Sequence, residues 1–197
     1  MATITAETVK TLREQSGAGV MECKRALEET GGDIEKAAAI LKERGQAAAA
    51  KRAGREANEG QIGHYIHTGS KIGVLIEVNC ETDFVARTDE FQRLVRDLAI
   101  QVAGLRPLYT TVDSIPEADI EAKKAALLAD EATMKKPEAI RPQIVEGQLK
   151  KWLAEVVLLE QPFRDQDRTV GQLVTEAIAK TGENIKVRRF VRFELGE

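Results

Sequence analysis

The sequence predicts an α+β protein, in which a bundle of three short helices precedes a core with a three-stranded antiparallel sheet. Glycines divide residues 1–45 into three short segments with the apolar periodicity of helices. Residues 60–66 and 71–79 alternate apolar and polar side chains around a glycine-containing turn, which is the pattern of a β-hairpin. Residues 186–194 complete the sheet as a last strand.

The ends of the N-terminal helices are also predicted. Thr5 and Asp33 precede the first and third helices, where a short side-chain oxygen can accept a hydrogen bond from a free first-turn N–H. Gly45 is expected to end the third helix. We therefore predict three domains or segments: a three-helix domain over 1–45, a linker helix over 46–59 and an α+β core over 60–197.

The apolar pattern of the hairpin selects a register. A three-residue loop places Ile62 opposite Val78, whereas a two-residue loop would place Ile62 opposite Glu77. We therefore expect the three-residue loop, with Ile62, His64 and Ile66 facing three apolar residues of the second strand.

This register bears on a possible catalytic pair. Cys80 would lie opposite Gly60, four residues from His64, which is roughly 13 Å along the sheet against the ~3 Å that a nucleophile and its base require. A cysteine-dependent enzyme is therefore not expected. We interpret His64 and His67 as packing or surface residues, and Cys23 as a small buried residue.

The rest of the chain is mainly helical. Four further helices are expected over 88–103, 115–136, 137–159 and 169–180. A charged loop is expected at 164–168. Arg188 and Arg189 interrupt the alternation of the last strand, which favours an edge or interface position over a buried one.

The corner between the second strand and the following helix, in residues 77–87, can be interpreted in two ways. Thr82 or Asp83 can cap the helix. Phe84 lies seven residues before Phe91, so a continuous helix would place both rings in the core. Alternatively, Phe84 projects from the corner and is received by a partner protein.

Composition excludes several classes of protein. The 197 residues are 43% hydrophobic, enough for one or two domains with a core. Only two cysteines occur, and neither a signal peptide nor a membrane-length apolar run is visible, so a cytoplasmic protein without a membrane partner is expected. No phosphate-binding glycine loop is present, and we expect no cofactor, metal or catalytic residue.

An RNA- or ribosome-binding module is the alternative function. The basic side chains in 46–59, together with Arg188 and Arg189, would supply its charge. The net charge of −3 and the lack of interleaved aromatic side chains count against direct nucleic-acid binding.

Two long segments, Leu12-Arg-Glu-Gln-Ser-Gly-Ala-Gly-Val-Met-Glu-Cys-Lys-Arg-Ala-Leu27 and Glu77-Val-Asn-Cys-Glu-Thr-Asp-Phe-Val-Ala-Arg87, closely resemble the two signatures of the elongation factor Ts family. Residues 161–163 and 182–189 look like further landmarks of that family. The resemblance implies a ubiquitin-associated (UBA)-like N-terminal domain and a core that binds elongation factor Tu (EF-Tu). It implies guanine-nucleotide exchange on EF-Tu, and thus no enzyme in the bond-breaking sense.

The resemblance also implies functional residues. The residues that would dislodge Mg²⁺ from GDP-bound EF-Tu are Thr82, Asp83, Phe84 and Val85. The residues of the N-terminal domain that would contact its G domain are Arg13, Val20 and Met21, although core packing is the alternative for the last two. Ser16 and Glu22 stand where many members have Thr and Asp. Long members add a second core subdomain and a coiled-coil insertion, for which this chain is too short. Short members act as homodimers, which implies a homodimer here, and we expect it to be built partly on the last strand and to pair through an exposed edge.

Overall fold

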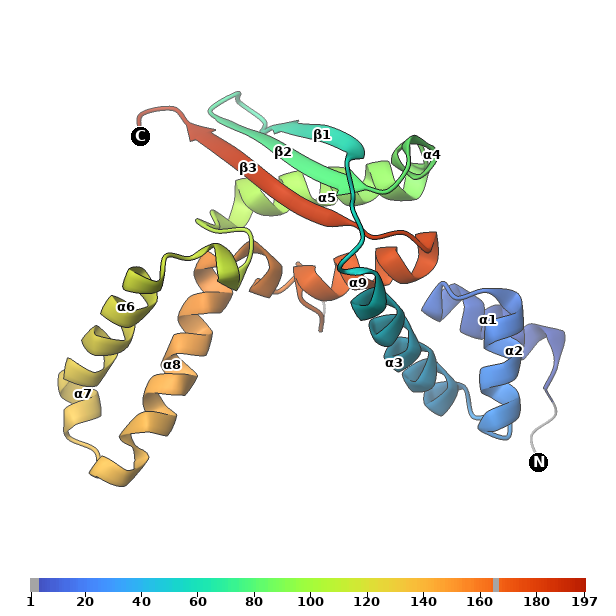
Figure 1. Ribbon diagram of the computed structural model, residues 1–197, viewed down its shortest axis with the longest axis horizontal. Coiled ribbons are helices and arrows are strands. Elements are labelled where there is room, and N and C mark those ends of the chain that lie inside the picture. The colour runs from blue at the N-terminus through green and yellow to red at the C-terminus, as the bar shows by residue number, and fades with distance from the viewer. Residues whose placement is uncertain (1–3, 165–166) are drawn as a thin grey trace. The chain divides into compact units, whose positions relative to one another are not determined.

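A computed structural model describes residues 4–164 and 167–197 of the protein, and it confirms the predicted α+β fold (Figure 1). The three-stranded antiparallel sheet has the order β1 (Glu59–Ile66), β2 (Ile72–Cys80) and β3 (Lys186–Glu194). β3 is therefore an edge strand, as its interrupted pattern predicts. Of the predicted charged loop, residues 165 and 166 lie outside the described residues.

The chain divides into two compact units. The first contains the chain up to Gln61, Val78–Leu94 and Val174–Lys186. The second contains Ile62–Glu77, Val95–Leu173 and Val187–Glu197. The predicted domain limits at residues 45 and 59 remain a prediction.

Three helices open the first unit: α1 (Ala6–Ser16), α2 (Val20–Glu29) and α3 (Ile34–Arg52). Both predicted caps are confirmed, since Thr5 Oγ1 accepts from the Thr8 N–H at 3.2 Å and Asp33 Oδ1 accepts from the Lys36 N–H at 3.0 Å. The helices share one apolar core, whose buried members are Leu12, Cys23, Ala26, Leu27, Ala37 and Leu41.

The predicted end of the third helix at Gly45 is wrong, because α3 continues through Gly45 to Arg52. A Cβ at position 45 would lie 3.2 Å from the Cβ of Ala179 in α9 (Val170–Thr181). Gly45 therefore lets α3 and α9 pack closely together, and the helix does not end there. The segment 46–59, which the sequence predicts to be helical, is helical only as far as Arg52, where it continues α3, and Glu59 already begins β1.

The predicted hairpin register is wrong by one residue. The His67 N–H donates to the Ile72 carbonyl at 2.9 Å, so four residues, 68–71, form the loop. Extending this register places Ile62 opposite Glu77, and a one-residue shift turns every side chain of a strand to the other face. Ile62 and Ile66 are accordingly exposed, whereas Val74 and Ile76 of β2 are buried.

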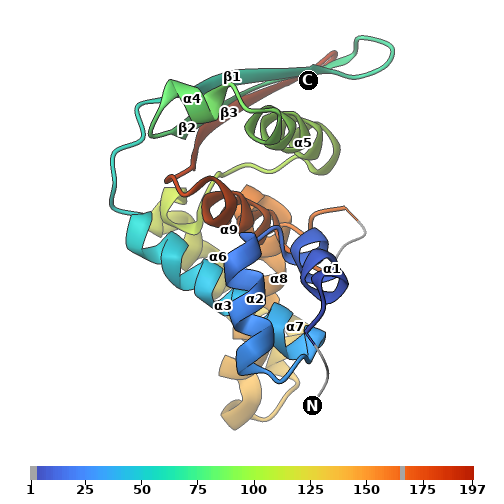
Figure 2. The ribbon, with the colours of Figure 1, turned by 90° about the vertical axis from the view of Figure 1, so that its right-hand side faces the viewer.

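α5 (Asp89–Leu105) covers one face of the sheet (Figure 2). The side chains buried on this face include Phe91, Leu94, Val95 and Leu98, which recur at the helical spacing. A short 3₁₀ helix, η1 (Val112–Ser114), then leads to the remaining helices.

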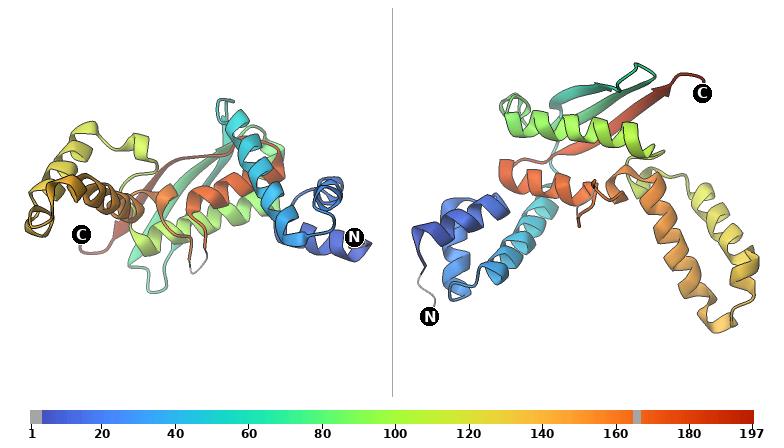
Figure 3. Two further views of the ribbon diagram at one scale, coloured as in Figure 1. Left: turned by 90° about the horizontal axis from the view of Figure 1, so that it is seen from below. Right: turned by 180° about the vertical axis from the view of Figure 1, so that it is seen from behind.

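An antiparallel helical hairpin follows in the second unit, with α6 (Glu117–Ala129) packed beside α8 (Arg141–Val156) (Figure 3). The predicted single helix over 115–136 is interrupted at Asp130, whose side chain caps the one-turn α7 (Glu131–Met134). The predicted helix from residue 137 begins only at Arg141. Pro142 stands in its first turn, where a missing N–H costs no helical hydrogen bond. Short 3₁₀ helices, η2 (Glu138–Ile140) and η3 (Leu158–Glu160), flank α8.

Candidate interface with a partner protein

The corner segment, which we define as residues 81–86, connects β2 to a one-turn helix, α4 (Asp83–Ala86). Of the two predicted caps, Thr82 is the one observed: its backbone is extended (φ −129°, ψ 154°) and its Oγ1 accepts from the Val85 N–H at 3.4 Å. Asp83 forms an ion pair with Arg87 at 2.7 Å. The segment therefore makes a sharp turn that ends before α5 begins.

Phe84 projects from this turn, with 78% of its surface exposed. The interpretation that Phe84 packs in the core is wrong, because it requires one continuous helix from Phe84 to Phe91. α4 and α5 are separate helices, so the seven-residue spacing does not place the two rings on the same face. Phe91 is buried, with 1% exposure. Among the predicted site residues, Thr82, Asp83 and Val85 are half-buried around the base of the exposed ring.

Hydrogen bonds from a distant segment hold the base of the turn. Glu183, between α9 and β3, accepts through Oε2 from the N–H groups of Glu81 at 3.1 Å and Thr82 at 3.0 Å. Its Oε1 accepts from the Thr82 hydroxyl at 2.6 Å. In return, Glu81 Oε1 accepts from the Asn184 N–H at 2.6 Å. Sequence reasoning missed the roles of Glu81, Glu183 and Asn184, although the last two lie in the landmark segment 182–189.

Cys80 lies directly beneath this network and is fully buried. Its Sγ donates to the Thr82 carbonyl at 3.1 Å, and burial, followed by the nearby Glu183 carboxylate, raises the pKa of the thiol to about 11. The sulfur is therefore protonated at neutral pH, which makes it a weak nucleophile.

A second exposed group lies at the turn between α1 and α2. Val20 and Met21 are 52% and 60% exposed, so the interpretation that they pack in the core is wrong. Arg13, in the last turn of α1, is exposed as well. The structure places all three predicted contact residues of the N-terminal helices, like the corner segment, in the first compact unit.

Ser16 and Glu22 have local structural roles at this turn. The Ser16 hydroxyl donates to the Leu12 carbonyl at 2.7 Å. Glu22 Oε2 accepts from the Gly19 N–H at 3.2 Å, at the start of α2. Both side chains are therefore held by hydrogen bonds to nearby backbone groups.

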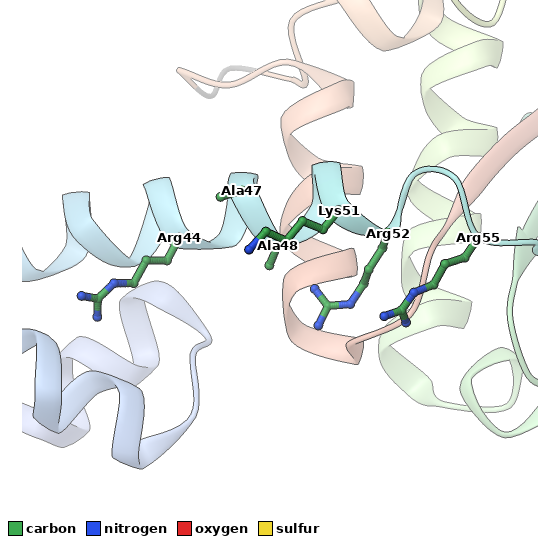
Figure 4. Close-up of a pocket in the computed structure, with 6 residues that line it drawn as sticks. All are labelled: Arg44, Ala47, Ala48, Lys51, Arg52 and Arg55. Atoms are coloured by element: carbon green, nitrogen blue, oxygen red, sulfur yellow. The ribbon is translucent and has the colours of Figure 1, made fainter.

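A hollow of about 330 Å³ lies along the C-terminal half of α3. Figure 4 shows the side chains that line it. Its lining residues are Arg44, Ala47, Ala48, Lys51, Arg52 and Arg55. Two of its cations are paired, Arg44 with Glu29 at 2.7 Å and Arg55 with Glu81 at 3.4 Å. Within the predicted linker segment, the ion pair of Arg55 thus leaves less free charge than the sequence indicates, which weakens the segment as an RNA-binding surface.

Two features are absent over residues 4–164 and 167–197. No group of three or more His, Cys, Asp or Glu side chains is arranged to hold a metal ion. None of the helices there combines the length and the apolar character that crossing a membrane requires.

An exposed aromatic ring on a braced turn, a second exposed apolar pair and a mixed α+β scaffold are typical of a protein that acts by contacting another protein. Comparison with known proteins agrees with this class. The family model described as "Elongation factor TS" matches residues 2–197. The chain therefore belongs to the elongation factor Ts family, and its role lies in translation elongation.

Individual relatives support the assignment over nearly the full length. The protein named elongation factor Ts from Heliobacterium modesticaldum is 55% identical over 195 residues, which cover 98% of this chain and 91% of that protein. The one from Carboxydothermus hydrogenoformans is also 55% identical, over 98% of this chain and 90% of its own length. The one from Cyanothece sp. is 53% identical over the whole chain, which spans 76% of that longer relative.

Proposed function

We propose that this protein is a guanine-nucleotide exchange factor that binds EF-Tu·GDP, dislodges Mg²⁺ and promotes GDP release, so that GTP can bind. The observation that carries the proposal is the 78% exposed Phe84 ring at the tip of the corner segment. A large apolar side chain held away from its own core has the form of an anchor for a pocket on a partner. In this proposal the protein is no enzyme, holds no cofactor and acts in the cytoplasm.

The physical basis of Mg²⁺ displacement is the strict geometry of the ion. Mg²⁺ requires nearly octahedral oxygen ligands at about 2.0–2.1 Å, and in nucleotide-binding proteins it bridges the protein and the phosphates. A phenyl ring inserted between elements of the G domain moves those ligands beyond this tolerance. The phosphate charge then loses its counter-ion, and GDP dissociates faster. Thr82, Asp83 and Val85 form the turn that presents the ring.

The second exposed group supplies binding without displacing the ion. Val20 and Met21 offer an adaptable apolar contact, and the guanidinium of Arg13 offers hydrogen bonds at its edge. Two separate contacts explain how a factor can hold nucleotide-free EF-Tu firmly while one ring disturbs the nucleotide site.

Release of labelled GDP from EF-Tu, with and without the protein, tests the exchange function. We expect a marked acceleration at millimolar Mg²⁺. Linkage adds a second test, because a factor that lowers GDP affinity must bind GDP-loaded EF-Tu more weakly than nucleotide-free EF-Tu by the same ratio. Equal affinity for the two forms, measured by calorimetry, would contradict the proposal.

We further propose that the protein is a homodimer built on the sheet of the second unit. The face opposite α5 carries five large apolar side chains that are at least 40% exposed: Ile62, Ile66, Leu75, Val191 and Phe193. Contiguous apolar surface on three strands is typical of an interface. A second copy is its occupant in this proposal because β3 is an edge strand, and because in a symmetric dimer the same apolar face of both copies can pack together.

RNA binding is the second candidate function. The α3 hollow favours this function because it contains cations without an ion-pair partner among the described residues, such as Lys51. A filter-binding assay across salt concentrations separates the two functions, because an RNA-binding module would show strong affinity that falls steeply with salt.

A further inference from the structure

The position of the exposed Phe84 ring is set by the backbone that carries it. With 78% of its surface exposed, the side chain has little packing of its own to orient it. Its position therefore follows from the backbone of the corner segment. The helical hydrogen bonds there are few, from the Ala86 N–H to the Thr82 carbonyl at 3.3 Å and from the Arg87 N–H to the Asp83 carbonyl at 3.2 Å. A single helical turn is unstable by itself, so another part of the chain must hold it.

Glu183 meets this requirement. One carboxylate accepts three hydrogen bonds, at 2.6 to 3.1 Å, from the two residues that directly precede α4. Hydrogen bonds to an ionised carboxylate are about twice as strong as neutral ones. Because Thr82 is the N-cap residue of α4, the bonds hold the φ and ψ angles that aim the whole turn.

The bonding is reciprocal, which restricts sliding of either segment. The Glu81 carboxylate accepts from the Asn184 N–H at 2.6 Å, so each segment offers a carboxylate to the backbone of the other. Asn184 is 2% exposed, and its Nδ2 donates to the Arg55 carbonyl at 2.7 Å. Gly182 adopts a left-handed φ of 75°, which ends α9 and places Glu183 at this contact.

The plain alternative is that these bonds only fasten the end of α9 to the fold. A matched ion pair distinguishes the two roles. Glu90, at the start of α5, pairs with Lys180 of α9 at 3.3 Å. This pair also links the end of α9 to the segment after β2, but it has no hydrogen bond to the backbone of the corner segment among the described residues.

We propose that Glu183 is a positioning residue for nucleotide exchange: its carboxylate holds residues 81 and 82 so that Phe84 reaches EF-Tu in the productive orientation. This inference rests on the proposed exchange function and adds a residue outside the exposed contact surface. Glu183 does not touch the partner in this proposal. It acts through the ring, by reducing the number of orientations that the turn can adopt before binding.

The test compares Glu183→Ala with Glu90→Ala in stimulated GDP release at millimolar Mg²⁺. We expect Glu183→Ala to lower the stimulated rate about tenfold, as a small misplacement of a functional group costs rate steeply, and Glu90→Ala to change it less than about twofold. A double-mutant cycle gives the decisive comparison. In a Phe84→Ala background the Glu183→Ala change should cost less than about twofold, because the ring through which it acts is gone.

A structural readout accompanies the rates. Amide hydrogen exchange should accelerate at residues 81 and 82 in Glu183→Ala, while the buried helices stay protected. If that variant fails to fold, Glu183→Gln keeps the size and one acceptor oxygen while losing the charge, and we expect about a threefold loss of rate from it.

Three outcomes would overturn the proposal. One is a parental exchange rate in a folded Glu183→Ala protein. Another is the same fold-loss with and without the Phe84 ring, which would mean that Glu183 acts on overall stability. The third is a parent protein that does not accelerate GDP release at all. Only this third result also overturns the proposed function, so the two failures are distinguishable.

Discussion

Gly63 of β1 lies so close to Val95 of α5 that a Cβ at position 63 would be 2.2 Å from Val95 Cγ1. Such a separation is impossible for two carbon atoms that are not bonded, so the helix can approach the sheet here only over a glycine. The contact also accounts for the hairpin register, because it requires Gly63, and not Ile62 or His64, on the buried face.

Gly63→Ala should therefore destabilise the fold. Val95 is 2% exposed and has little room to move, so the added methyl overpacks the site at a cost of about 1–3 kcal/mol. Gly147, in the middle of α8, is the matched control, since nothing lies within 4 Å of a Cβ there. Gly147→Ala should stabilise the protein by up to about 1 kcal/mol through helix propensity. Chemical denaturation of both variants measures the contrast, and equal effects would contradict the close approach.

Phe84→Ala should separate exchange from folding. Because the ring is exposed, unfolding free energy should change by no more than about 0.5 kcal/mol, against about 3–5 kcal/mol for a buried phenylalanine. Affinity for nucleotide-free EF-Tu should weaken modestly, since Arg13, Val20 and Met21 remain. Stimulated GDP release should fall more, because in the proposed mechanism the ring is what disturbs the Mg²⁺ site.

A chelator provides the control for that variant. Without Mg²⁺ the effect of the ring on the ion is already achieved, so the rates of Phe84→Ala and the parent should converge. A Phe84→Ala protein that melts normally and exchanges at the parental rate with Mg²⁺ present would show that another residue carries the function.

Phe193→Asp should dissociate the proposed dimer. Phe193 is 67% exposed on the apolar sheet face, and burying a carboxylate there against the apolar face of a second copy would carry a large desolvation penalty. Leu128→Asp, on the helical hairpin at 47% exposure, is the control that should leave the dimer intact. Sedimentation at micromolar concentration checks both variants. A parent protein that sediments only as a 21.7 kDa species would refute the dimer.

Cys80 should make stability fall with rising pH in the alkaline range. The folded protein keeps the thiol proton up to a pKa of about 11, whereas the ordinary thiol pKa is 9.0. Between about pH 9 and 11 the unfolded chain therefore loses a proton that the folded chain retains, which favours unfolding by about 1–3 kcal/mol in total. Below about pH 9 this destabilisation is absent, because the thiol is protonated in both the folded and the unfolded chain. Unfolding free energies of the parent and Cys80→Ala should converge as the pH rises, and a difference independent of pH would contradict the shift.

Local signals in the sequence were sufficient for most of the elements. Thr5, Asp33 and Thr82 cap helices because a side-chain oxygen three residues from a free N–H needs no distant partner. The spacing of Phe91, Leu94 and Leu98 likewise follows from the helical period alone. The two long signature segments indicated the family for the same reason, since they are contiguous in the chain.

Tertiary contacts decided what local signals could not. Gly45 and Gly63 are residues of a type that often breaks helices and strands, but each lies within an element. At Gly63 the approach of α5 leaves no room for a Cβ, and at Gly45 a Cβ would make a tight contact with α9. The exposure of Phe84 required knowing that α4 and α5 are separate helices. The reciprocal bonds between Glu81–Thr82 and Glu183–Asn184 join residues about 100 positions apart, as the 101-residue separation of Thr82 and Glu183 shows. The sequence alone thus determined the family, the fold class and the helix caps, whose causes are local. Only the folded chain decided the hairpin register and the support of the corner segment, because both depend on which distant surfaces pack together.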